Sequence, residues 1–83
     1  MEEFKQRLAC AEITIRRFDD YHMRHDLLRL FETCNNIYTK LTQEAITCRR
    51  IHKPTIKYNE LAIQLDETLR HLEQNITFAT LII

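Results

Sequence analysis

The stretch that decides the fold is CRRIHKPTIKYNELA, residues 48–62. It holds the single proline of the chain, Pro54, and the 83-residue sequence contains no glycine. Proline is disfavoured inside a helix because it lacks the N–H group and clashes with the preceding turn. It is tolerated where a helix begins, and it biases the preceding residue, Lys53, away from helical angles. The stretch therefore predicts that one helix ends near residues 50–52 and a second begins near residues 54–56.

Apolar residues with heptad spacing continue on both sides of this stretch. Before the proline, apolar residues recur at intervals of four and three at Leu27, Phe31, Cys34, Tyr38, Leu41, Ala45 and Cys48. After the proline, the same spacing is followed by Tyr58, Ala62, Leu65, Leu69, Leu72, Ile76, Ala79 and Ile83. We call these two rows the first seam and the second seam. Rows of this spacing lie on one face of a helix and are typical of coiled coils.

A third row of the same spacing lies near the N-terminus, at Phe4, Leu8, Ala11, Ile15 and Phe18. Its phase continues to His22 and His25, whereas the first seam starts at Leu27, two residues out of step. Either one long helix changes its apolar face or the chain breaks between the two rows. We favour a break, because Asp19 or Asp20 could cap a new helix.

These rows predict an all-α fold in a single helical domain, residues 1–83. We expect an antiparallel, coiled-coil-like helical hairpin over about residues 27–51 and 55–80, with an additional N-terminal helix over about residues 2–19. In such a hairpin the two seams face each other and form the core.

The facing layers of the hairpin can be assigned from spacing alone. In the register that we expect, Cys48 faces Ala62 and Phe31 faces Ala79, so that small residues tend to meet larger ones, as close packing requires. A slip of one layer stays open.

Composition and charge limit the function classes. The chain is 45% hydrophobic and 29% charged, which is typical of a globular domain and not of a disordered one. Twelve basic residues balance twelve acidic ones. Because proteins that bind nucleic acid usually carry a basic stripe, we expect no nucleic-acid partner.

Three observations bear on location. Three widely spaced cysteines do not form a disulfide framework, which favours a reducing compartment. The charged start MEEFKQRL is unlike a signal peptide. The apolar C-terminal run ITFATLII is much shorter than the roughly 20 residues of a membrane span. We expect a cytoplasmic protein with no membrane span.

Catalytic and cofactor chemistry have little support. The chain has no serine nucleophile and no glycine for a phosphate-binding loop, so we expect no enzyme activity and no cofactor. His22 and His25 share a helical face, but no further ligand follows at a zinc-motif spacing, so we expect no metal site. Cys34 and Cys48 lie on the first seam and are expected to pack as small hydrophobic residues.

One short pattern suggests an alternative. Arg17 and His22, with four residues between them, resemble the RNA-cleaving motif of the HEPN family of helical nucleases. That resemblance implies that both residues contact a scissile phosphate, and it covers only residues 17–22.

The chain holds more apolar residues than the seams use. Eight of them form the candidate partner-binding set: Leu28, Leu30, Ile37, Leu61, Ile63, Phe78, Leu81 and Ile82. Some should meet the N-terminal helix, and the rest should leave an exposed apolar patch of the kind that marks partner surfaces. The sequence thus predicts a non-catalytic protein–protein interaction module that forms hetero-oligomers or homo-oligomers through helical faces.

A family resemblance narrows this prediction. The pattern is carried by Pro54, Tyr58, Leu61, Leu65, Leu69, Leu72 and Ile76. Over roughly residues 27–80 it resembles the small helical-hairpin co-chaperones of the type III secretion needle subunit. In that family the second helix often opens with a proline or acidic residue and a tyrosine. The chain departs from the family in lacking the usual glycine of the turn and in its longer N-terminal helix.

The resemblance implies a role in protein transport, as one half of a heterodimer with a repeat-containing chaperone that keeps the needle subunit unpolymerised. The alternative is a structural subunit of a eukaryotic coiled-coil assembly, such as a kinetochore or vesicle-tethering complex.

Overall fold

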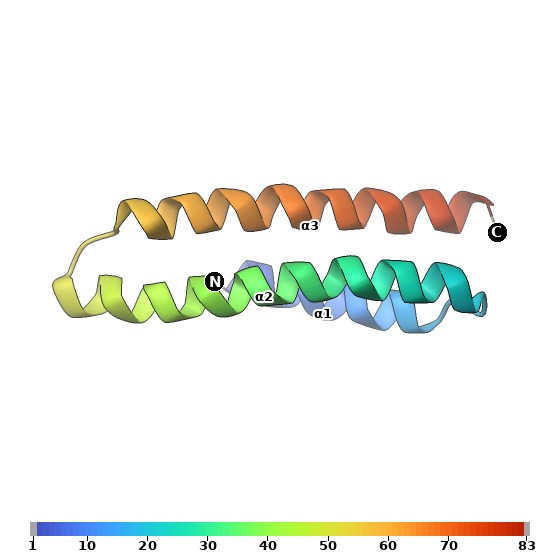
Figure 1. Cartoon of the computed structure of the whole chain (residues 1–83), viewed down its shortest axis with the longest axis horizontal. Helices are drawn as coiled ribbons and strands as arrows, with labels where there is room; N and C mark the ends of the chain where they lie inside the picture. Colours follow the sequence, from blue (N-terminus) through green and yellow to red (C-terminus); the bar gives the residue numbers. More distant parts are fainter. Residues whose placement is uncertain (1, 83) are drawn as a thin grey trace.

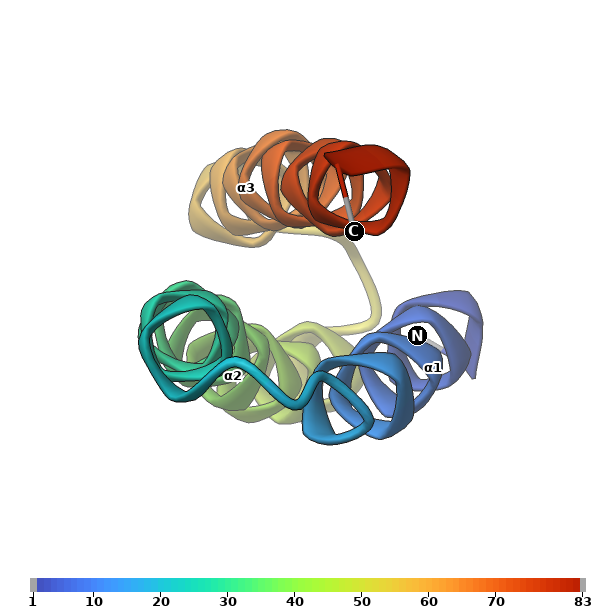
Figure 2. The ribbon, with the colours of Figure 1, turned by 90° about the vertical axis from the view of Figure 1, so that its right-hand side faces the viewer.

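The computed structural model describes residues 2–82 as three helices: α1 (Glu2–Arg16), α2 (Tyr21–Ile51) and α3 (Ile56–Ile82). Helices α2 and α3 form an antiparallel hairpin in a rod of 48 × 17 × 16 Å (Figure 1). Seen end-on, α1 occupies the third corner of a triangle with the hairpin (Figure 2), and it contacts both other helices. The predicted all-α fold, a helical hairpin with an N-terminal helix, is confirmed.

Helix α2 ends at a turn built without glycine. His52 follows the helix in the left-handed conformation, with φ of 61°. Its N–H and that of Lys53 both donate to the carbonyl of Cys48, which satisfies an acceptor that the helix end leaves free. A β-carbon makes this conformation costly. The helix nevertheless ends here because the following proline keeps Lys53 out of the helical region.

Helix α3 begins at a threonine cap. The hydroxyl of Thr55 accepts from the N–H of Tyr58 at 3.0 Å and donates to Glu44 Oε2 at 2.7 Å. One side chain thus caps α3 and ties it to α2. Pro54 stands just outside the cap, and α3 starts at Ile56, at the late edge of the predicted range.

The predicted break between the N-terminal row and the first seam is also present. Asp20, in an extended conformation, accepts from the N–H of Met23 at 2.9 Å and caps α2. Helix α2 therefore begins at Tyr21, well before the predicted residue 27, and α1 ends at Arg16 instead of near residue 19. The start of α2 differs from the prediction because the Asp20 cap, and not the first apolar residue of the seam, determines where the helix begins.

The core contains the three predicted rows. Every row residue within residues 2–82 is buried or half-buried, while Ile83 lies outside the described part of the chain. Six side chains are essentially inaccessible: Ile15, Cys34, Leu41, Leu65, Leu69 and Leu72. Among residues 2–82 no polar or charged side chain is fully buried, so the core depends on apolar packing.

Two observations near the ends of the hairpin test the expected register. Cys48 Sγ lies 3.7 Å from Thr55 Oγ1. Thr55 stands seven residues, about two helical turns, before Ala62, which was expected to face Cys48. At the other end, Ala79 lines a hollow together with Leu27. At the turn, Cys48 therefore meets the cap of α3 and not its second turn, so the expected register does not hold at that end.

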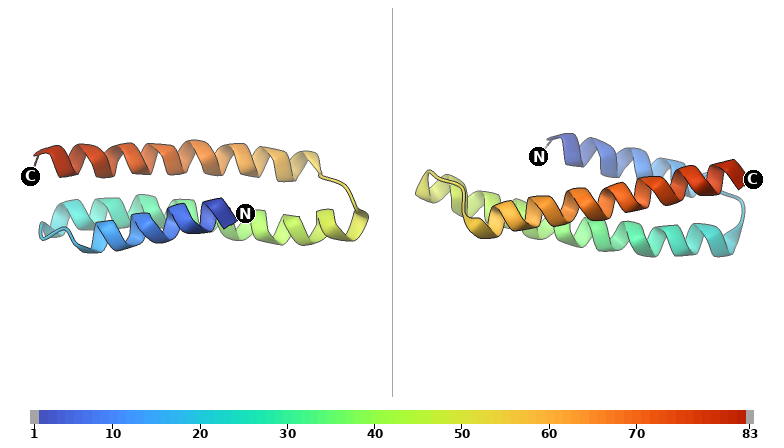
Figure 3. Two further views of the ribbon diagram at one scale, coloured as in Figure 1. Left: turned by 180° about the vertical axis from the view of Figure 1, so that it is seen from behind. Right: turned by 90° about the horizontal axis from the view of Figure 1, so that it is seen from above.

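Helix α1 covers only part of the hairpin. It lies along the half that is remote from the α2–α3 turn, and its N-terminus ends near the middle of the rod (Figure 3). The half with the turn consists of two helices only, so this half exposes a face that α1 covers elsewhere.

Candidate functional site

The structure divides the eight apolar residues of the predicted partner surface. Ile37 is 7% exposed and belongs to the core. Three residues are half-buried against the core: Leu28, Leu30 and Leu61. Four remain 59–78% exposed: Ile63, Phe78, Leu81 and Ile82. The exposed four can meet a partner without unfolding of the bundle.

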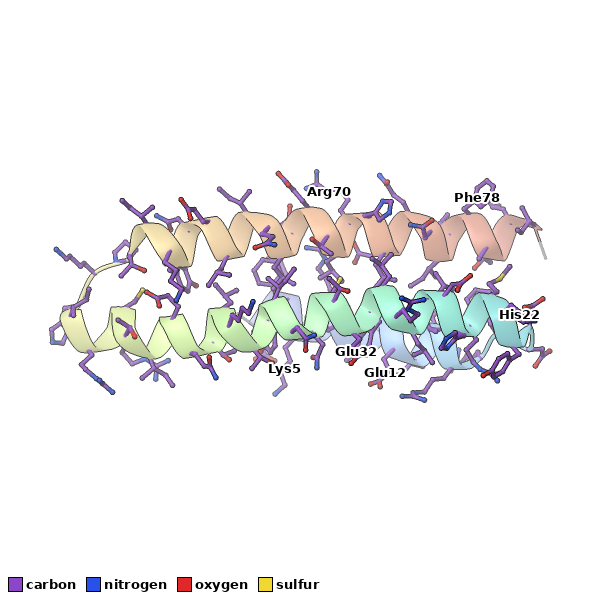
Figure 4. The ribbon with its side chains drawn as sticks, viewed as in Figure 1. Lys5, Glu12, His22, Glu32, Arg70 and Phe78 are labelled. Atoms are coloured by element: carbon purple, nitrogen blue, oxygen red, sulfur yellow. The ribbon has the colours of Figure 1, made fainter. Side chains whose placement is uncertain are left out.

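Three of these exposed residues, Phe78, Leu81 and Ile82, form what we call the α3 end patch. They stand three and four positions apart in the last turns of α3, so their side chains are neighbours. The opposite face of the same turns carries the buried Ile76 and Ala79. Figure 4 shows Phe78 pointing outward from the bundle. The patch is therefore surplus to the core.

A shallow hollow lies on each side of Phe78. The first, of about 450 Å³, is on α3 and is lined by Phe78 and Leu81 with Arg70 and Glu73. The second, of about 380 Å³, lies between the start of α2 and the end of α3 and is lined by Phe78, Ile82, Met23, Leu27 and Asp26. An apolar centre with charged residues at its edge is the usual composition of a protein interface.

An ion-pair cluster fixes α1 beside the first hollow. The guanidinium of Arg7 makes a two-pronged contact with Glu73, at 3.0 Å from Nε to Oε2 and 2.7 Å from Nη2 to Oε1. Its Nη1 lies 2.8 Å from Oδ1 of Asp66, whose other oxygen lies 2.8 Å from Arg70 Nη2. This cluster was not predicted from the sequence. Its only signal is that Asp66 and Glu73 stand two turns apart beside the second seam.

These contacts shift two pKa values. The hydrogen bond from Arg7 holds the pKa of Asp66 below its ordinary value, and the charge of Arg70 acts in the same direction. The hydrogen bonds to Glu73 raise the pKa of Arg7 above its already high ordinary value. Both shifts mean that the charged forms are favoured in the folded chain.

The Arg7 cluster predicts a pH-dependent stability. The pKa of Asp66 is lower in the folded chain than in the unfolded chain, where it is about 3.9. The carboxylate therefore contributes its full stabilisation above the pKa of the unfolded chain. This stabilisation is lost as the pH falls through the pKa of the folded chain. We expect Arg7→Gln to reduce the free energy of unfolding by about 1 kcal/mol at pH 7, since the carboxylates are partly exposed and screened. Urea unfolding from pH 7 to pH 2.5 should show this difference shrinking below about pH 4.

The matched control is Arg16→Gln, which removes an exposed pair with Glu12 within α1. It should change stability by less than about 0.5 kcal/mol at either pH. An Arg7→Gln variant that is as stable as the wild type at pH 7 would show that the cluster does not hold α1 to the hairpin.

The histidine pair lies at the exposed start of α2. The ring of Tyr21 stacks on His25 with centroids 6.0 Å apart and lies T-shaped to the ring of His22, with centroids 5.7 Å apart. Among residues 2–82 no group of three or more His, Cys, Asp or Glu side chains is placed to hold a metal ion. Arg17, the other residue of the HEPN-like pattern, is exposed in the turn after α1.

The three cysteines are free thiols in three environments. Cys10 is exposed, Cys48 is half-buried and Cys34 is buried. Burial raises the pKa of Cys34 to about 11, so this thiol is protonated and behaves as a small hydrophobic side chain. The two seam cysteines thus lie on the inward face, as predicted.

Five large exposed apolar residues were absent from the predicted surface: Ile13, Tyr21, Ile46, Ile51 and Ile56. Each stands outside the three rows, which is the signal that could have identified them. Ile51 and Ile56 flank the α2–α3 turn.

Over residues 2–82, no helix combines the length and apolar character that crossing a bilayer requires. Comparisons with protein-family models, with curated proteins and with solved structures find no match to this chain.

Proposed function

We propose that the chain is a non-catalytic helical interaction module whose α3 end patch binds an apolar helix of a partner protein, as a small chaperone or co-chaperone subunit does. One observation carries this proposal. Phe78, Leu81 and Ile82 are 65%, 78% and 61% exposed and adjacent, although the core of the bundle is completed by other residues. Contiguous exposed apolar side chains of this size mark partner surfaces.

The geometry suits a helical partner. Residues three and four apart offer anchors along one line, and the hollows beside Phe78 can receive side chains that recur at the same interval. Full burial of a Leu, Ile or Phe contributes about 1.5–3 kcal/mol. Three such residues can therefore support a specific contact, and partner binding would also stabilise this small bundle.

The turn supports a narrower version of the proposal. A helical hairpin whose second helix opens with Pro54 and Tyr58 is the feature shared with co-chaperones of the type III secretion needle subunit. In this version the partner is a cytoplasmic repeat-containing chaperone, and the module helps to keep the needle subunit unpolymerised before its transport.

The second candidate is a structural subunit of a coiled-coil assembly. The exposed Ile46 and Ile63 favour it, because they lie outside the α3 end patch, on the part of the hairpin nearer the α2–α3 turn. An assembly in which further helices pack alongside the hairpin would cover them.

The double variant Phe78→Asp/Leu81→Asp is expected to lose partner binding and to keep the fold. Both side chains are mostly exposed, so helicity by circular dichroism should not change. Loss of two central apolar anchors should weaken binding by at least about 30-fold. The measurement is recovery of partners from an extract of the native host on immobilised chain, followed by titration of the recovered partner.

The matched control is Ile63→Asp, which places the same charge at an exposed position of the same helix outside the patch. It should bind the partner as the wild type does. Partner binding that is equal in all three proteins would contradict the proposal. So would light scattering that shows a monomer at micromolar concentration together with no recovered partner.

A further inference from the structure

The end of the rod at the α2–α3 turn is strongly basic. Residues 45–59 contain four Lys or Arg residues, Arg49, Arg50, Lys53 and Lys57, and no Asp or Glu. All four are exposed. The whole chain has a formal net charge of zero. Positive charge is therefore concentrated at this end of a molecule that is neutral as a whole.

Little carboxylate charge opposes these cations. The nearest acidic residues in sequence are Glu44 and Glu60. Glu44 is only 13% exposed; it accepts the hydroxyl hydrogen bond of Thr55 and reaches Lys57 at 4.0 Å. Among the ion pairs formed by residues 2–82, none involves the other three cations of the turn. The positive field of this end is therefore directed to solvent.

Two large aliphatic side chains stand among the cations. Ile51, the last residue of α2, is 45% exposed, and Ile56, the first residue of α3, is 78% exposed. Of the four residues between them, His52, Lys53 and Pro54 are exposed and Thr55 is half-buried. We call the six side chains Arg49, Arg50, Ile51, Lys53, Ile56 and Lys57 the basic tip. It caps a rod that measures only 17 × 16 Å in cross-section (Figure 1).

We propose that the basic tip docks on an anionic phospholipid surface. The four cations would lie against the headgroups, and Ile51 and Ile56 would enter the boundary between headgroups and acyl chains. Basic residues beside a membrane are attracted by its negative surface potential, and interfacial aliphatic groups add apolar burial. The basic tip supplies both the cations and the aliphatic side chains at the α2–α3 turn.

A lipid surface fits the tip better than the other anionic partners. Single-stranded nucleic acids bind along positively charged grooves in which aromatic rings stack on the bases, whereas the exposed apolar groups here are aliphatic and stand at a narrow end. A folded acidic protein must match the shape of the tip, while a fluid bilayer adapts to a protruding end. The tip lies at the opposite end of the 48 Å rod from the α3 end patch, so membrane docking leaves the patch free.

Sedimentation with lipid vesicles tests the charge component. The full chain should bind vesicles of 70% phosphatidylcholine and 30% phosphatidylserine, with little binding to pure phosphatidylcholine, and the affinity should fall with salt. Each Lys or Arg near such a surface is worth about a fivefold change in partitioning. The variant Arg49→Gln/Arg50→Gln should therefore bind about 25-fold more weakly.

The matched control removes two exposed arginines away from the tip, as Arg17→Gln/Arg29→Gln. It changes the net charge by the same amount, and its binding should stay within about twofold of the wild type. Equal weakening by the two double variants would mean that net charge alone drives binding, and would overturn the assignment to the tip.

A tryptophan probe tests the aliphatic component. The chain has no tryptophan, so Ile56→Trp provides a single emission that should shift to shorter wavelength with the phosphatidylserine vesicles. Ile13→Trp, on α1 at a comparably exposed position, should show no shift. Failure of the wild type to bind these vesicles overturns the proposal. Tip-dependent binding to an oligonucleotide or to polyglutamate without vesicle binding also overturns it, and an unshifted Ile56→Trp emission overturns the insertion of the isoleucines.

Discussion

Replacing Leu69 with aspartate is expected to abolish the cooperative fold. Leu69 is inaccessible to solvent in the middle of α3, and the core of residues 2–82 offers no buried polar side chain as a partner for a carboxylate. The loss of a buried leucine costs about 2–5 kcal/mol, and an unpaired buried charge adds several kcal/mol. Their sum reaches the whole stability of a small domain, which is about 5–15 kcal/mol.

The measurement is circular dichroism at 222 nm through a thermal scan, with Ile63→Asp as the matched control. Ile63 lies on the same helix and is 59% exposed, so the same substitution should change stability by about 0.5 kcal/mol or less. If Leu69→Asp instead melts cooperatively with the wild-type helical signal, the second seam does not face the core.

The helices of this fold could be predicted because apolar spacing is a local property. Rows spaced four and three define a helix and its inward face without any knowledge of the partner helix. The bounds depend on single hydrogen bonds. Asp20 and Thr55 were each one of several polar residues near a break, and only the folded chain shows which oxygen accepts from Met23 or Tyr58.

The partner surface could be predicted only in part. Ile37 and Ile63 both stand beside a seam and look alike in sequence, yet Ile37 is 7% exposed and Ile63 is 59% exposed. The difference depends on how the three helices pack against one another, which includes the placement of α1 along one half of the hairpin. The contacts of Arg7 with Asp66 and Glu73 likewise join residues far apart in the chain, which no local pattern relates.

The three cysteines are expected to react with a thiol reagent at three separate rates, with Cys10 fastest and Cys34 slowest. At pH 8 a thiol with a pKa of about 11 is about 0.1% thiolate, whereas an ordinary cysteine with a pKa of about 8.5 is about one-quarter thiolate. Cys34 is also inaccessible, so its reaction requires opening of the bundle. The raised pKa slows reaction of the buried thiol, and the cost of opening slows reaction through an open form, so Cys34 should react slower than Cys10 by a factor on the order of 100.

Alkylation with iodoacetamide followed by peptide mass spectrometry measures each rate separately. The control is the same reaction in guanidinium chloride, where all three thiols should react at similar rates because the unfolded chain protects none of them. Since Cys34 and Cys48 lie on the first seam and Cys10 lies beside the N-terminal row, the order of rates also reports how α1 and α2 are rotated about their axes. Rapid reaction of Cys34 in the folded chain would mean that the first seam of α2 faces away from the core. A different face of α2 would then have to pack against α3.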